Sequence, residues 1–194
     1  MTHRRNIRPQ TKEEIHLRDA LAATLGLNPI ISLLLVQRGI TTANQALHYF
    51  NPDLRDLHDP FLMPDMHKAV KRLNKALGNK ERIMIYGDYD VDGTTAVALV
   101  YKFLRAYSSS IEYYIPDRYD EGYGISFKSI DYAVSRGITL VISLDCGIKA
   151  IDKVAYANER GIDFIICDHH MPDDELPAAV AVLDAKRTDS QYPY

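Results

Sequence analysis

The chain has 194 residues, of which 46% are hydrophobic and 25% charged, and its formal net charge at pH 7 is -3. These values are typical of an ordinary globular protein with one large domain, or with a domain and a smaller module. No apolar run approaches the ~20 residues that a membrane-spanning helix needs, and the N-terminal segment lacks the apolar core of a signal peptide. We therefore expect a cytoplasmic protein with no membrane partner.

The charge is unevenly distributed, because the first 80 residues are net basic and the remainder is net acidic. A basic arm beside an acidic body suits a polyanionic partner whose site is neutralised by metal ions, but a solvated surface explains the same pattern equally well. The two cysteines, Cys146 and Cys167, end apolar runs and have no zinc-type spacing. We predict that both are free thiols.

Residues 1–80 have helical periodicity and no strand pattern. Helices are predicted within 17–40 and 66–79, joined by a Pro-containing connection at 50–64, so a small helical N-terminal module is expected over 1–80. The second of these segments carries basic residues at helical spacing, which fit a solvated face and, less readily, a DNA path. These residues are Lys68, Lys71, Arg72 and Lys75.

From residue 82 onward, short β-branched or aromatic runs alternate with segments of helical period. The runs are 82–87, 111–116, 139–146, 163–168 and 178–184, and the helical segments between them are 94–107, 126–136 and 149–160. This alternation predicts an α/β domain over 81–194, with a mostly parallel sheet and helices on both faces. Ligands of such sheets bind at the carboxyl ends of the strands.

Acidic and histidine side chains follow three of these predicted strands. Asp88, Asp90 and Asp92 follow the first, Asp145 lies at the end of the third, and Asp168, His169 and His170 come at the end of the fourth. A lone Asp at a strand end often only caps the next helix, and for Asp145 alone that reading is as good as a functional one. Two adjacent histidines after an Asp are harder to explain by packing.

Carboxylates this crowded repel one another, so the cluster needs either protons or cations. Carboxylates with one or two imidazoles suit Mn²⁺ or Mg²⁺ better than structural zinc, which favours thiolates. Two such ions ~3.5–4 Å apart can hold both the attacking and the leaving oxygen of a phosphoryl transfer. The residues therefore predict metal-assisted hydrolysis of a phosphoester.

Three motifs at these strand ends resemble those of the DHH phosphoesterase superfamily: GDYDVDGTTA (87–96), SLDCGI (143–148) and CDHHMP (167–172). The loop IPDRYDEGYGIS (115–126) and the helical N-terminal stretch are similar to the branch of single-strand-specific exonucleases. The resemblance covers nearly the whole chain. It implies 5′→3′ hydrolysis of single-stranded DNA, in DNA repair and recombination, with two divalent ions, Mn²⁺ or Mg²⁺.

The resemblance also implies roles for individual residues. The metal ligands would be Asp88, Asp90, Asp92, Asp145 and His169. His170 would face the scissile phosphate, and Asp168 would orient the histidine pair. Arg118 and Tyr123 would contact phosphate or a stacked base, although a structural turn explains them nearly as well. Single-stranded DNA is the implied partner, and a single-strand-binding protein or a helicase are further candidates.

The resemblance is incomplete at the C-terminal end, because the family has a fourth motif and further domains that this chain does not contain. The chain is therefore expected to be an N-terminal fragment, with an incomplete phosphoesterase domain that could be inactive alone. Alternatives are another DHH enzyme acting on nano-RNA, cyclic dinucleotides or pyrophosphate, and a non-catalytic DHH scaffold. DVDGT (90–94) also satisfies the signature of haloacid dehalogenase-type phosphatases, with Asp90 as the nucleophile and Asp92 as the acid/base.

Overall fold

The computed structural model of the chain describes residues 9–193, which fall into two compact units divided after Leu57. In the first unit, helices pack around Leu21, Leu35, Val36 and Ala46. Each α-helix begins at a polar cap whose side chain accepts a backbone N–H, as is usual at helix N-termini. The elements are α1 (Lys12–Leu25), α2 (Pro29–Val36), α3 (Ala43–Phe50) and the 3₁₀ turn η1 (Leu54–Asp56).

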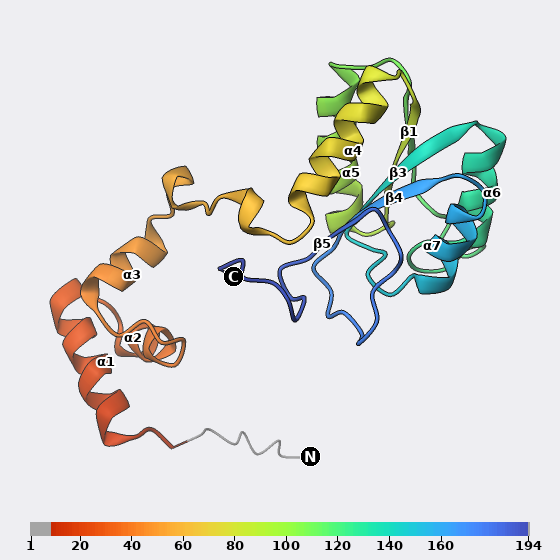
Figure 1. The fold of residues 1–194 in the computed structure, drawn as a ribbon. Helices are drawn as coiled ribbons and strands as arrows, with labels where there is room; N and C mark the ends of the chain where they lie inside the picture. Colours follow the sequence, from red (N-terminus) through yellow and green to blue (C-terminus); the bar gives the residue numbers. More distant parts are fainter. Residues whose placement is uncertain (1–8, 194) are drawn as a thin grey trace, which may run out of the picture. The chain divides into compact units, whose positions relative to one another are not determined.

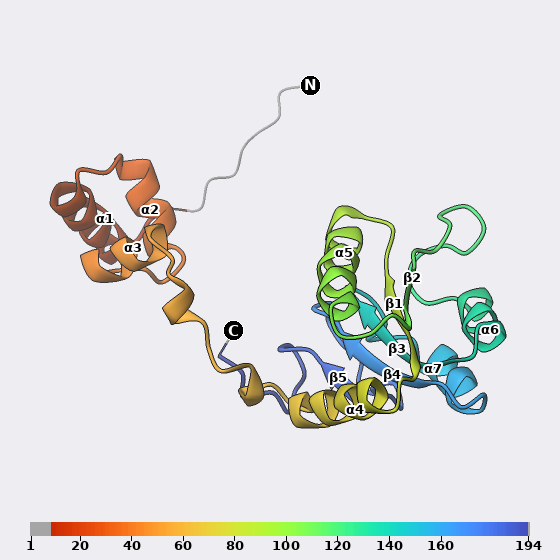
Figure 2. The ribbon, with the colours of Figure 1, turned by 90° about the horizontal axis from the view of Figure 1, so that it is seen from above.

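The second unit contains a five-stranded sheet in which every pair of neighbouring strands is parallel. The strand order is β2-β1-β3-β4-β5, in which β1, β3, β4 and β5 are labelled in Figure 1 and β2 in Figure 2. The strands are β1 (Arg82–Gly87), β2 (Ile111–Tyr114), β3 (Ile138–Leu144), β4 (Asp163–Cys167) and β5 (Ala181–Leu183). The helical elements are η2 (Pro60–Leu62), α4 (Met66–Gly78), α5 (Val91–Arg105), α6 (Phe127–Ser135) and α7 (Ile151–Asn158). The predicted α/β class with a parallel sheet is thus confirmed.

Helices cover both faces of the sheet, because alternate residues of each buried strand point to opposite sides. Ile83 and Ile85 of β1 pack with α4 and α5, whereas Met84 and Tyr86 pack with α6 and α7. Figure 2 shows α6 and α7 across the sheet from α5. Because both faces of the sheet are covered, the strand sequences are nearly continuous apolar runs.

The boundary between the two units differs from the predicted one. The sequence placed it after residue 80, whereas the structure divides the chain after Leu57. Helix α4 belongs to the sheet unit because its Ala69 and Ala76 are buried in the core against the strands. The Arg72 side chain, only 10% exposed, pairs with Glu81 at 2.7 Å and with Asp163. Arg72 therefore holds α4 on the sheet and is not free to line a DNA path.

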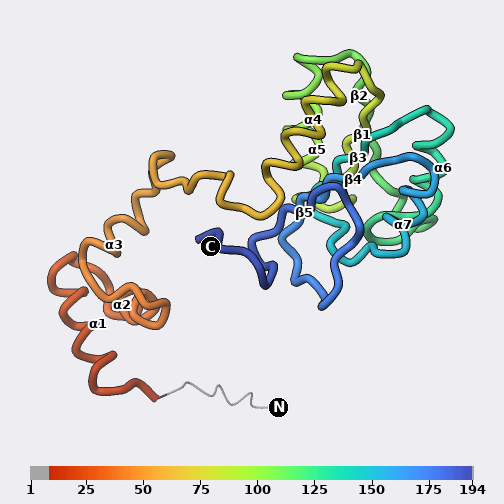
Figure 3. The backbone as a smooth tube through the Cα atoms, viewed as in Figure 1, coloured from red at the N-terminus to blue at the C-terminus, as the bar shows by residue number. Residues whose placement is uncertain are grey.

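The C-terminal part of this unit returns to the start of α4. After β4, the chain reaches β5 through residues 168–180 without forming a helix (Figure 3). Beyond β5, Arg187 donates hydrogen bonds to Asp65 at 2.7 Å and to the backbone oxygen of Val182 at 2.6 Å. No helix in the described part of the chain has the length and apolarity needed to cross a membrane. Both cysteines are free.

Candidate metal and phosphate site

One aspartate follows each of four adjacent strands at the carboxyl edge of the sheet. The last paired residues of these strands form a single row in the register, namely Gly87, Leu144, Cys167 and Leu183. The residue after each of them is an aspartate, which gives Asp88, Asp145, Asp168 and Asp184. Because parallel strands end at the same edge, the topology brings together carboxylates that are up to 96 positions apart in the sequence.

Asp88 is fully buried and only partly satisfied. Its Oδ1 accepts a hydrogen bond from the backbone N–H of Tyr89 at 2.6 Å, while its Oδ2 has no partner among the described residues. Helix α5 starts directly against it, since a Cβ at Gly93 would lie 2.5 Å from the backbone oxygen of Asp88. Glycine at this position therefore permits close packing of the helix on the strand.

Asp90 and Asp92 lie at the beginning of α5. Asp90 is the N-cap, and its Oδ1 accepts the backbone N–H of Gly93 at 3.0 Å. The helix thus starts at Val91, three residues earlier than predicted, because Asp90 provides the cap. Asp92 is exposed in the first turn, where the partial positive charge of the helix N-terminus favours a carboxylate.

Asp145 occupies a left-handed backbone conformation, with φ 61°, and its N–H donates to the backbone oxygen of Cys167 at 2.9 Å. Its side chain does not cap α7 but pairs with Nε2 of His169 at 2.9 Å. Burial, followed by the nearby charge of Asp90, raises the pKa of the Asp145 carboxyl above its usual range. The helix-capping alternative for Asp145 is therefore wrong.

Asp168 holds the histidine pair and the preceding loop in place. Its Oδ2 accepts the backbone N–H of Ile148 at 2.9 Å, and its Oδ1 accepts those of His169 and His170 at 2.7 and 3.1 Å. Nδ1 of His170 lies 2.7 Å from the same Oδ1. Burial alone would raise the pKa of Asp168, but these hydrogen bonds lower it overall, and the Asp168 carboxylate raises the pKa of His170.

Three possible ligand atoms lie close together, one each from Asp145, His169 and His170, all within 4.8 Å of one another. Asp88, Asp90 and Asp92 are not part of this tight group, although Asp90 and Asp92 are near enough to raise the pKa of Asp145. Oxygen and imidazole donors of this kind suit Mn²⁺ or Mg²⁺. The unpartnered, buried Oδ2 of Asp88 also fits a cation, because a buried carboxylate oxygen without a hydrogen bond is costly.

The predicted substrate-contact residues Arg118 and Tyr123 belong to a series of ring contacts that ends at His170. We call this series the ring ladder. The Arg118 guanidinium lies 4.5 Å from the centre of the Tyr89 ring, and the Tyr89 and Tyr123 rings are perpendicular at 5.9 Å. The Tyr123 hydroxyl lies 3.4 Å from Nε2 of His170. Glu121 anchors this loop by accepting hydrogen bonds from Tyr114 and from the backbone of Asp117, both at 3.0 Å.

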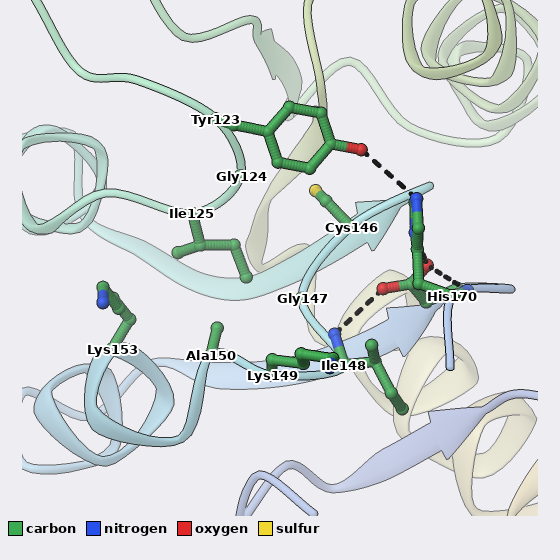
Figure 4. Close-up of a pocket in the computed structure, with 11 residues that line it drawn as sticks. Tyr123, Gly124, Ile125, Cys146, Gly147, Ile148, Lys149, Ala150, Lys153 and His170 are labelled. Carbon is green, nitrogen blue, oxygen red and sulfur yellow. Dashed lines mark hydrogen bonds and ion pairs between the residues drawn. The ribbon is translucent and has the colours of Figure 1, made fainter. Parts of the chain in front are cut away.

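A cavity of about 280 Å³ opens beside His170 (Figure 4). Tyr123 and Ile125 reach it from the loop after β2, and Cys146 and Ala150 reach it from the segment between β3 and α7. His170 stands at its edge, with the dashed contact to the Tyr123 hydroxyl across the opening. The cavity thus adjoins the histidine that was predicted to face the scissile phosphate.

Sequence reasoning missed three residues of this region. Asp184 is 1% exposed, its Oδ1 accepts the backbone N–H of Lys186 at 2.7 Å, and its Oδ2 has no partner among the described residues. The Lys186 ammonium donates to the backbone oxygen of His169. Tyr89 is the middle of the ring ladder. The signal for Asp184 was present, because it follows a predicted strand as the other aspartates do.

Comparison with known proteins identifies similar sequences. The sequence model of the DHH family, N-terminal domain, matches residues 82–191. The single-stranded-DNA-specific exonuclease RecJ of Bacillus subtilis is 39% identical over 175 residues, and that of Dickeya dadantii is 33% identical over 188. These alignments cover 90% and 96% of this chain, but only 22% and 31% of the two relatives. The chain therefore spans less than a third of the length of either relative.

Solved structures give the same picture of the fold. A crystal structure of exonuclease RecJ bound to manganese superimposes with a TM-score of 0.62 at 28% identity, over 69% of this chain and 34% of that one. RecJ of Thermus thermophilus in complex with Mn²⁺ superimposes with a TM-score of 0.66 at 24% identity, over 91% of this chain and 24% of the other. At that identity, the second comparison concerns the fold alone.

Proposed function

This chain belongs to the DHH family, and on that premise we propose that it provides the metal-binding part of a 5′→3′ exonuclease for single-stranded DNA. The observation that carries the proposal is the row of aspartates at the edge of the sheet, with His169 and His170 beside it. The similarity to RecJ proteins supports the choice of single-stranded DNA as substrate. The haloacid dehalogenase alternative would leave Asp145 and the histidine pair without a role.

The metal centre is assigned to Asp88, Asp90, Asp92, Asp145 and His169. Two divalent ions bound there would neutralise phosphate charge and lower the pKa of a water molecule. Manganese is the first candidate, because a RecJ structure 28% identical to this chain was solved with that metal. Without cations, the carboxylates repel, and the charge of Asp90 adds to burial in raising the pKa of Asp145.

His170 is positioned to act on the phosphate. Nδ1 of His170 is hydrogen-bonded to the Asp168 carboxylate. Nε2 of the same ring therefore faces the open site and the Tyr123 hydroxyl. Asp168 raises the pKa of His170, and the Nε2–H of the protonated ring can donate to a phosphate oxygen or to the leaving oxygen. Arg118 and Tyr123 are proposed to contact the phosphate or a base next to it.

The test measures Mn²⁺ binding and the degradation of 5′-labelled single-stranded DNA by the protein. In Asp145→Asn, we expect Mn²⁺ affinity to fall at least tenfold and hydrolysis to fall about 100-fold or more. Asparagine tolerates the left-handed conformation of residue 145, so the fold should be retained. Hydrolysis that persists in a metal chelator, or an Asp145→Asn variant as active as the unchanged protein, would refute the proposal.

A further inference from the structure

The cavity beside His170 has an apolar interior, although it opens at an acidic edge of the sheet. Its lining includes the buried side chains of Ile125, Cys146 and Ile148. A dry, apolar cavity of about 150 Å³ can hold a benzene ring. A space of about 280 Å³ therefore has room for a larger flat ring system with some water.

The mouth of the cavity has the chemistry of a stacking site. The Tyr123 ring is 55% exposed and meets the His170 ring at right angles, with 6.2 Å between the centroids. On the far wall, Lys153 lies with its Nζ 5.3 Å from the centre of the Phe127 ring. Figure 4 shows Lys153 and Ala150 on the side of the cavity away from Tyr123. The walls thus present an exposed aromatic ring and the Lys153 ammonium, which also pairs with Asp152 at 3.0 Å, around an apolar floor.

We propose that this cavity holds the base of the nucleotide whose phosphodiester bond is hydrolysed. The inference rests on the proposed function and extends it, since Asp168 and His170 line both the cavity and the phosphate site. A base attached through its sugar to a phosphate at His170 is the group that can reach the adjoining space. Stacking on aromatic side chains does not depend on base identity, which suits an exonuclease that meets every base in turn.

This arrangement also gives a physical reason for selectivity toward single strands. A base in a duplex is stacked and paired, and extracting it costs a few kcal/mol, whereas an unpaired base enters a pocket at little cost. The buried side chains of Ile125 and Ile148 line the cavity, so a base that enters it leaves its stack and its pairing partner. Occupation of the cavity therefore requires an unpaired end.

The first test compares two ligands on the unchanged protein in the presence of Mn²⁺. Thymidine 5′-monophosphate carries a base, and 2-deoxyribose 5-phosphate lacks it. If the base occupies the cavity, calorimetry should show at least ~tenfold tighter binding of the nucleotide, as expected for one stacked base. Equal affinity for the two ligands would overturn the inference without any variant being made.

The second test fills the cavity with Ala150→Phe and uses Ala155→Phe as its matched control. Ala150 lines the cavity just before α7, whereas Ala155 is exposed on that helix. In Ala150→Phe, the affinity for thymidine 5′-monophosphate should fall to that for 2-deoxyribose 5-phosphate, while the latter stays unchanged. Ala155→Phe should bind both as the unchanged protein does. Retained nucleotide preference in a folded Ala150→Phe variant would overturn the inference.

The outcomes separate this inference from the proposed function. If neither ligand binds with Mn²⁺ and single-stranded DNA is not degraded, the proposed function fails and the inference falls with it. If DNA is degraded with Mn²⁺ but the two ligands bind equally well, only the base site is refuted. Thermal unfolding of both alanine variants shows whether a loss of affinity comes from the filled cavity or from a disturbed fold.

Discussion

At the scale of single residues, the site depends on where each aspartate follows its strand. Asp88, Asp145 and Asp168 each come directly after the last paired residue of a strand, and those paired residues form one register row, so the crowding is a property of the sheet as much as of the motifs. Asp184, which the motifs did not single out, follows the same row. Its Oδ2 is buried without a partner among the described residues, and burial raises the pKa of its carboxyl above the usual range.

Asp184→Asn should change how stability depends on pH. A raised folded-state pKa means that the folded protein holds the proton more tightly than the unfolded chain. The contribution of Asp184 to stability is therefore present below the usual Asp pKa of about 3.9 and is lost as pH rises through the higher folded value. The free energy of unfolding of Asp184→Asn, minus that of the unchanged protein, should rise across this window in urea titrations with chelator.

Asp189→Asn provides a control of opposite sign. The hydrogen bond from Arg187 lowers the pKa of Asp189, so this group stabilises the fold above the usual Asp pKa and loses that effect as pH falls. Its variant should therefore lose stability relative to the unchanged protein as pH rises. Parallel pH curves for the Asp184→Asn variant and the unchanged protein would contradict the expected burial effect.

The site residues that the sequence predicted and those that it missed are brought together by different parts of the structure. Strand-end aspartates and the histidine pair follow from chain order, because a parallel sheet gathers its carboxyl ends. The ladder from Arg118 through Tyr89 to Tyr123 does not, since it depends on the path of a loop that Glu121 anchors through side-chain hydrogen bonds. Such tertiary contacts leave no periodic signal in one sequence.

At the scale of elements, the start of α5 is the most constrained part of the site. Only residues 88–90 separate β1 from the helix, and Gly93 lies against the backbone of Asp88. The sequence located this helix to within three residues but assigned its first turn to the preceding loop. The error arises because the alternate motif residues Asp88, Asp90 and Asp92 follow the strand, cap the helix and lie in its first turn, with only residues 88–90 between β1 and α5.

Gly93→Ala should destabilise the protein by about 1–3 kcal/mol, because the added Cβ would lie 2.5 Å from the backbone oxygen of Asp88. Gly78→Ala is the matched control, since this glycine also lies in a helix but has nothing within 4 Å of an added Cβ. The control should gain up to ~1 kcal/mol from the higher helix propensity of alanine. Urea denaturation measures both, and equal effects of the two substitutions would show that close packing at Gly93 is unimportant.

At the scale of the whole molecule, the fold class was predictable but the division of the chain was not. The alternation of strands and helices predicted the parallel sheet, and the structure confirms it. Helix α4 has the same basic, amphipathic composition as a solvated helix, so its sequence did not indicate which unit it joins. The ion pairs of the buried Arg72 side chain with Glu81 and Asp163 decide this, and Asp163 lies 91 positions away in the sequence.

The structural boundary predicts how shortened chains behave. A chain beginning at His58 retains α4 and should unfold cooperatively, whereas one beginning at residue 81 exposes the sheet face covered by Ala69 and Ala76. The second chain also lacks the ion pairs of Arg72 with Glu81 and Asp163. Denaturation and protease resistance distinguish the two. A chain from residue 81 as stable as that from His58 would place the boundary where the sequence suggested.

The hydrogen bond between Asp65 and Arg187 has a consequence for folding kinetics. It joins positions 122 residues apart, so the entropy of closing that loop is lost before the contact forms, unless the sheet has already brought the two segments together. We therefore expect the contact to form late, after the transition state for folding. Interactions of this kind slow unfolding and leave the folding rate nearly unchanged, so this contact should lengthen the lifetime of the assembled sheet.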